Sequence, residues 1–126
     1  MEQNKIMTVV KSYPEAFKLM DTSLIDKNFT KNASKTGVLY DYETKKWGEL
    51  TNANIEEIKK WVTVHNKENS MPDIHIKSQI IDIQDKIALV KIELEWIKNI
   101  KGSDYILLVK KGNEWLIDKI YYQSII

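Results

Sequence analysis

The spacing of apolar residues changes near residue 74, from the period of a helix to that of a strand. Before it, two stripes recur at three- and four-residue steps, which indicates one apolar side of a helix. They are Ile6, Val9, Val10, Tyr13, Phe17 and Met20, and then Ile55, Ile58, Trp61, Val62 and His65. After residue 74 the period is two. The clearest strand is predicted over Ile87–Ile97, where apolar residues alternate with Lys91, Glu93 and Glu95.

Residues with special backbone or capping chemistry bound the predicted helices. Pro14 lies inside the first stripe and cannot donate a hydrogen bond to the carbonyl of Val10, so we expect a kink or break there. Ser23 predicts the cap of a short second helix. Asn54 and Glu57 have the spacing of a capping box at the start of the third helix. Between the second and third helices, residues 31–35 are polar and predict a loop, and a strand is expected over residues 37–42.

Two irregularities are predicted in the strand-rich half. Ile74 and Ile76 have one parity, whereas Ile81 and Ile83 have the other, so we expect a β-bulge near residues 78–80. The last two strands are predicted to form a hairpin that turns at Lys111-Gly112.

This hairpin register places Asp104 directly opposite Lys119. A cross-strand pair of opposite charge stabilises a sheet by ~0.2–1 kcal/mol. The pair has two interpretations, a structural contact that fixes the register and a polar anchor in the floor of a cavity.

Helices followed by a meander of strands predict an α+β fold in one domain over residues 1–126. The 19 basic and 18 acidic residues nearly cancel, which argues against a nucleic-acid partner. The chain has no cysteine, which excludes disulfides, thiolate metal sites and cysteine nucleophiles. No apolar run is long enough for a membrane span or an export signal, so a cytoplasmic location is expected.

Few residues offer chemistry. His65 lies on the apolar side of the third helix, where it is either a base or donor in a pocket or a histidine satisfied by the backbone. Neither histidine has an Asp or Glu at metal-ligand spacing, so no metal site is predicted. Four tryptophans are many for this length, and aromatic residues often line sites for planar ligands. The candidate ligand-binding residues are Tyr13, Phe17, Trp61, His65, Trp96, Asp104 and Lys119, and the candidate catalytic residues are His65 and Asp104.

The closing hairpin carries a resemblance to a known family. Asp104-Tyr105, Gly112, Trp115, Ile117 and Lys119 match the end of the small bacterial family described as putative lumazine-binding, in the nuclear-transport-factor-2-like superfamily. The resemblance implies a cystatin-like cone, in which a curved antiparallel or mixed sheet packs on three helices around a cavity. Superfamily members include isomerases, dehydratases, cyclases and non-catalytic binding modules.

Three functions follow as hypotheses. The first is a small-molecule-binding domain with an aromatic cavity and no cofactor. The second is an isomerase, dehydratase or cyclase that acts on a small hydrophobic or cyclic substrate by general acid–base catalysis. The third is a dimerisation module. Since the closing strands are apolar on both parities, a homodimer through the outer face of the sheet is expected in any of these cases.

Overall fold

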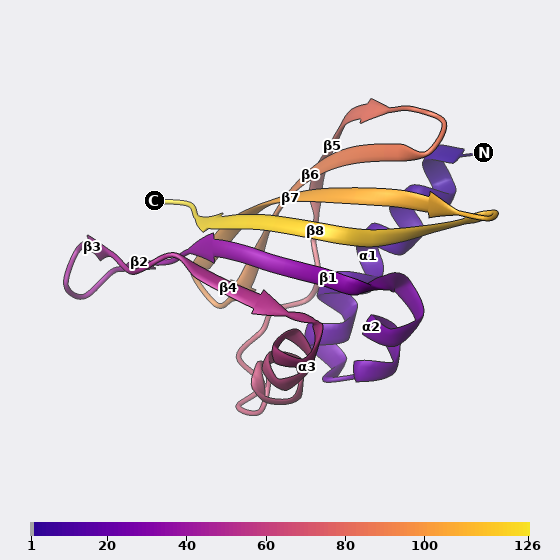
Figure 1. Ribbon diagram of the computed structural model, residues 1–126. Helices are drawn as coiled ribbons and strands as arrows, with labels where there is room; N and C mark the ends of the chain where they lie inside the picture. Colours follow the sequence, from indigo (N-terminus) through magenta and orange to yellow (C-terminus); the bar gives the residue numbers. More distant parts are fainter. Residues whose placement is uncertain (1) are drawn as a thin grey trace.

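The computed structural model describes residues 2–126, which form one mixed β-sheet with helices on one of its faces, and a small hairpin (Figure 1). The helices are α1 (Glu2–Leu19), α2 (Thr22–Asn28) and α3 (Ile55–Val64). The long strands are β1 (Phe29–Val38), β6 (Ile87–Ile97), β7 (Ile100–Lys111) and β8 (Glu114–Ser124). The shorter strands are β2 (Tyr40–Asp41), β3 (Lys46–Trp47), β4 (Thr51–Asn54) and β5 (Lys77–Ile83). The α+β fold class is therefore confirmed.

The main sheet has six strands in the order β4-β1-β8-β7-β6-β5. Neighbouring strands are antiparallel except β1 and β8, which are parallel. The hairpin of β2 and β3 projects from the body of the molecule, beside the C-terminus (Figure 1).

The core lies between the helices and the inner face of the sheet. The alternation predicted for β6 is confirmed, because Ala88, Val90, Ile92 and Leu94 are buried in turn. They meet the side of α1 that carries Ile6, Val10, Tyr13 and Phe17. The apolar stripe predicted from the spacing therefore covers the inner face of the sheet, except at Met20, which lies beyond the end of α1 and is exposed.

The helix ends agree in part with the sequence. The capping box is confirmed, since Asn54 accepts from the backbone N–H of Glu57 while the Glu57 side chain accepts from that of Asn54. The predicted cap of α2 is wrong, because Asp21 and not Ser23 is the N-cap. Asp21 accepts from the backbone N–H of Ser23 at 2.9 Å. Of the kink or break predicted at Pro14, the break is wrong, since α1 continues through this residue, and the kink stays a prediction.

The loop predicted over residues 31–35 is in fact the middle of β1. Its inward positions are Ala33, Lys35 and Gly37, which are buried although none is a large apolar residue. A strand is predicted from a sequence by the alternation of large apolar residues. The middle of β1 lacks them at its inward positions, so the sequence pattern does not predict it.

The register predicted for the closing hairpin is wrong by two residues near its turn. Gly112 and Asn113 form the turn, and Gly112 takes a φ of 63°, in the left-handed region that glycine adopts without strain. A further irregularity lies in β8 at Asp118. Together these shifts place Asp104 opposite Tyr122, whereas Lys119 lies opposite Leu107 on the other face of the sheet. The predicted pair of Asp104 with Lys119 is not formed.

The bulge predicted in β5 exists, one residue beyond the predicted range. The pairing of β5 with β6 shifts between Ile80 and Asp82, so that Ile80 and Ile83 both pack on the core and Ile81 is exposed. No helix within residues 2–126 is long and apolar enough to cross a membrane. The single domain and the cytoplasmic location stay predictions.

Candidate functional site

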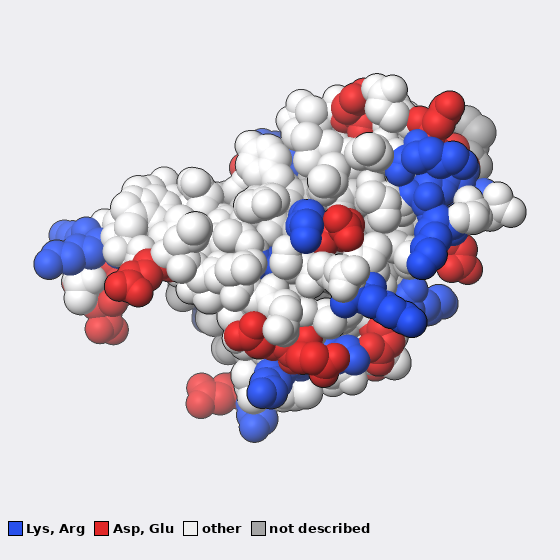
Figure 2. All heavy atoms as spheres, in the orientation of Figure 1, with Lys and Arg blue, Asp and Glu red and all other residues white. Residues whose placement is uncertain are grey.

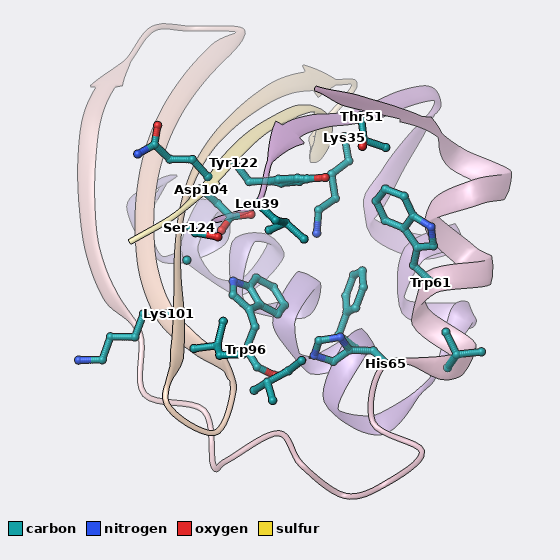
Figure 3. Close-up of a pocket in the computed structure, with 16 residues that line it drawn as sticks. Lys35, Leu39, Thr51, Trp61, His65, Trp96, Lys101, Asp104, Tyr122 and Ser124 are labelled. Carbon is teal, nitrogen blue, oxygen red and sulfur yellow. The ribbon is translucent and has the colours of Figure 1, made fainter. Parts of the chain in front are cut away.

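A pocket of about 400 Å³ opens between the inner face of the sheet and α3 (Figure 3). This volume is within the range of small-molecule sites. Its walls are mostly apolar and aromatic, and a few polar groups converge on them. The side chains that define it are those of Phe17, Lys35, Leu39, Trp61, His65, Trp96, Asp104 and Tyr122, with Thr51, Val64, Ile97, Ile100, Lys101, Gly102, Gln123 and Ser124 completing the lining.

Lys35 extends from β1 into the middle of this pocket (Figure 3). It is only 8 % exposed, and its ammonium makes no hydrogen bond or ion pair with any of residues 2–126. Five aromatic rings surround the Nζ atom instead, with centroids at 4.7 to 5.9 Å. They belong to Tyr13, Phe17, Trp61, Trp96 and Tyr122. Cation–π attraction compensates part of the cost of burying this charge.

Burial of Lys35 has a direct electrostatic consequence. It lowers the pKa of the amine from 10.5 to about 8, and the Asp104 carboxyl group acts in the opposite direction. A measurable fraction of Lys35 is therefore uncharged near neutral pH, unlike that of a lysine in water.

Asp104 is the second polar group of the pocket and is fully buried. Its Oδ2 atom accepts a hydrogen bond from the Tyr13 hydroxyl at 2.7 Å, whereas Oδ1 has no hydrogen-bond partner within residues 2–126. Burial raises the pKa of Asp104, and Lys35, Tyr13 and the Trp96 indole all lower it. Burial, followed by the Asp104 charge, also raises the pKa of Tyr13.

His65 is the C-cap residue of α3 and lines the pocket. Its Nε2 atom lies 2.9 Å from the carbonyl oxygen of Trp96, which requires a proton on Nε2. Burial lowers the pKa of His65, and the nearby Lys35 charge acts in the same direction. The neutral ring is therefore favoured. The interpretation as a histidine satisfied by a backbone group is confirmed. The ring also lines the pocket, and a role there as a base or donor stays a prediction.

Two glycines make room for aromatic walls. A Cβ atom at Gly37 would lie 2.1 Å from the Tyr122 ring, and one at Gly102 would lie 2.9 Å from the Trp96 indole. Any other residue at Gly37 would push Tyr122 out of place. The shape of the pocket therefore depends on these two positions as well as on the rings themselves.

The structure brings together most of the site residues predicted from the sequence. Phe17, Trp61, His65, Trp96 and Asp104 line one pocket. Tyr13 lies behind it and holds Asp104. Lys119 is not part of it, because that lysine is on the outer face of the sheet. That the lining residues bind a ligand stays a prediction.

Sequence reasoning missed Lys35 and Tyr122. Lys35 lies in the segment interpreted as a loop, and its burial follows from pairing with β8, where it is opposite the buried Ile120. A signal was present in the parity of Ala33, Lys35 and Gly37, but small residues carry no hydrophobic weight. Residues 2–126 contain no group of three or more His, Cys, Asp or Glu that could hold a metal ion. The chemistry available is that of an amine, a carboxyl group and aromatic surfaces.

Comparison with solved structures finds the same fold in several bacterial proteins. A nuclear-transport-factor-2-like protein of unknown function from Silicibacter pomeroyi DSS-3 is 18% identical, with a TM-score of 0.75 over 98% of this chain and 96% of the other. A second such protein, from Shewanella baltica OS155, is 22% identical, with a TM-score of 0.73 over 99% and 94%. A putative scytalone dehydratase from Novosphingobium aromaticivorans DSM 12444 is 11% identical, with a TM-score of 0.67 over 99% and 85%. At these identities the likeness shows the fold alone.

The comparison with curated proteins found no match. The model of one family, described as "Putative lumazine-binding", matches residues 1–123. This match covers nearly the whole chain, including every residue that lines the pocket except Ser124. The chain therefore belongs to the putative lumazine-binding family, with a nuclear-transport-factor-2-like fold.

Proposed function

We propose that this protein binds a small, planar ligand in the pocket between the sheet and α3. The observation that carries the proposal is the buried Lys35, whose ammonium lies among five aromatic rings in the pocket. Flat rings offer stacking surfaces, and an ammonium without a hydrogen-bond acceptor offers a donor to a carbonyl or anionic oxygen.

The ligand class follows from these groups. A fused aromatic or heteroaromatic ring with a carbonyl or carboxylate oxygen would stack between Trp61 and Trp96 and accept from Lys35. The family description names lumazine, a bicyclic ring of this kind, which supports the class without fixing the compound.

Calorimetric titration with lumazine and with 2-naphthoate tests the proposal. We expect saturable binding of at least one probe by the wild type, and an affinity about tenfold weaker in Trp61→Ala, because one stacking wall is lost. Trp47→Ala is the matched control, since Trp47 lies in β3 outside the pocket and should leave the affinity unchanged. An equal loss in both variants, or no binding of either probe, would contradict the proposal.

General acid–base catalysis is a second candidate, favoured by the hydrogen bond between Tyr13 and Asp104 at the pocket wall. A carboxyl group with a raised pKa and an unpartnered oxygen is suited to move a proton. Of the candidates, Asp104 has an oxygen unpartnered within residues 2–126 and a raised pKa, whereas His65 donates its Nε2 proton to Trp96, has only Nδ1 left to act as a base and has a lowered pKa. The dehydratase named among the similar structures supports such a role only by analogy of fold.

Proton exchange on a cyclic ketone distinguishes the two candidates. If Asp104 is a base, the protein should accelerate deuterium uptake by 2-tetralone in D₂O, and Asp104→Asn should abolish the effect. Lys35→Arg, which keeps the positive charge but has no primary amine, should retain it. Exchange at the uncatalysed rate in the wild type would leave ligand binding as the function.

We also propose that the chain forms a homodimer through the outer face of the sheet. Tyr105 and Tyr121 pair across β7 and β8 on this face and are 41% and 54% exposed. Leu107, Val109 and Leu116 extend the apolar area. Figure 2 shows this side of the sheet as a broad area in which charged side chains are few toward the β2–β3 hairpin. Exposed apolar areas of this kind often mark an interface.

A further inference from the structure

We propose that Lys35 is a nucleophile that forms a reversible imine with an aromatic aldehyde or ketone held in the pocket. The inference rests on the proposed function in one respect, since the carbonyl compound must enter the same pocket. It goes further in assigning a covalent step to a named atom, the Nζ of Lys35.

The first support is the position of the amine. Lys35 is more than nine-tenths buried, points into the pocket and has no acceptor among residues 2–126 to hold its protons (Figure 3). A lysine kept for structure would be expected to pair with a carboxylate, as Lys59 does with Asp26. The Nζ atom of Lys35 instead lies among aromatic rings. An aromatic aldehyde or ketone that stacks on these rings would bring its carbonyl carbon close to this nitrogen.

The second support is the state of the amine. Only an uncharged amine attacks a carbonyl carbon, and burial makes this form accessible near neutral pH. The titratable groups that face it are Tyr13 from α1, His65 from α3, Asp104 from β7 and Tyr122 from β8. Of these, Asp104 is the group that favours the cation and so keeps the lowering moderate.

The step balances without any further reagent. The Nζ lone pair forms a bond to the carbonyl carbon, and the carbonyl oxygen takes up a proton from the nitrogen to give a carbinolamine. Loss of that hydroxyl with one more proton releases water and leaves a carbon–nitrogen double bond. Protonation of this imine restores a positive charge at the place where the five rings and Asp104 favour one.

The chain suits a labelling experiment because all 19 of its basic residues are lysines and each serves as an internal reference. The protein is incubated at pH 7.5 with 2-naphthaldehyde and sodium cyanoborohydride, which reduces the protonated imine to a stable secondary amine. Peptide mass spectrometry then gives the rate at each lysine. Lys101 is the comparison, because it also borders the pocket but is exposed and points away from it (Figure 3).

We expect Lys35 to be labelled at least ~10-fold faster than Lys101. The uncharged fraction of Lys35 at this pH is ~100-fold larger than that of a lysine in water, and restricted access to the pocket reduces part of that advantage. Lys35→Arg should lose this fast label and keep the slow background on other lysines. Circular dichroism checks that the variant is folded, and the comparison within the wild type does not depend on it.

Two negative results have different meanings. In the first, 2-naphthaldehyde quenches the tryptophan fluorescence and the quenching is lost in Trp61→Ala, but Lys35 is labelled no faster than Lys101. The aldehyde then enters the pocket without forming an imine, so the imine is overturned and ligand binding stands. If the aldehyde neither quenches nor labels Lys35 selectively, and lumazine and 2-naphthoate also fail to bind, both the imine and the proposed function are overturned.

Discussion

At the scale of single residues, the main feature of the pocket is the amine of Lys35, which has no carboxylate of residues 2–126 paired with it. Lys35 is buried among aromatic rings, and Asp104, although close enough to influence its pKa, forms no ion pair with it. Burial of such a group is costly, and proteins keep it mainly where it is used. Lys35 therefore has a testable effect on stability.

The stability of the wild type should rise with pH relative to that of Lys35→Met. The pKa of Lys35 is about 8 in the folded protein and 10.5 for an ordinary lysine. Between pH 8 and pH 10.5 the unfolded state therefore binds more protons than the folded state. The free energy of unfolding should gain about 2 kcal/mol over Lys35→Met from pH 8 to pH 10. Urea denaturation at several pH values measures this difference, with Lys101→Met as the control at an exposed lysine of the pocket rim. A constant difference between wild type and Lys35→Met would mean that Lys35 titrates normally.

Alanine substitution at the two glycines that make room for the aromatic walls should destabilise the protein to different extents. Gly37→Ala forces a Cβ to within 2.1 Å of the Tyr122 ring, whereas Gly102→Ala brings one to 2.9 Å from Trp96. We expect Gly37→Ala to cost on the order of 1–3 kcal/mol of stability and Gly102→Ala less, because the indole edge needs only a small shift. Thermal denaturation of both variants measures the order, which the reverse ranking would refute.

At the scale of elements, the sequence predicts regular pieces well and irregular ones poorly. β6 and the capping box of α3 appear where the pattern places them, because large apolar residues and a strong cap define them. β1 was missed because small residues and a lysine form its buried side. The prediction of the register between β7 and β8 failed because tertiary packing sets the shifted turn and the bulge at Asp118. The same errors hid Lys35 and paired Asp104 with the wrong residue.

The capping box positions one wall of the pocket, since α3 carries Trp61 and His65. Asn54→Ala removes the side chain that accepts from Glu57 and should lower the free energy of unfolding by about 1 kcal/mol. Asn52→Ala on β4 tests a neighbouring asparagine whose side chain contacts Thr36 at an exposed position. The two variants should differ in chemical denaturation, and equal losses would show that the cap contributes nothing special.

At the scale of the whole molecule, the fold presents two apolar regions to solvent. One is the pocket and its rim, where Leu39 is 62% and Val64 51% exposed. The other is the outer face of the sheet around Tyr105 and Tyr121. Because the pocket is on the inner face, a dimer through the outer face would leave both pockets open to ligand.

The dimer has a direct test in Leu116→Lys. Leu116 pairs with Val109 and lies between the buried Trp115 and Ile117, so it faces outward, as the dimer proposal requires. Light scattering should show a wild-type mass of twice the 14.8 kDa chain at micromolar concentration and a folded monomer for the variant. A wild-type monomer would reject the dimer, and an unfolded variant would show that Leu116 supports the core.

The most direct test of ligand binding in the pocket is the response of the tryptophan indole signals in ¹H–¹⁵N NMR spectra. The four tryptophans report on different places, with Trp61 and Trp96 in the pocket, Trp47 in the small hairpin and Trp115 bonded to Glu2. Titration with lumazine or 2-naphthoate should shift the signals of Trp61 and Trp96 in a saturable way and leave those of Trp47 and Trp115 in place. Shifts confined to Trp47 or Trp115, or no shift with either compound, would contradict ligand binding in this pocket.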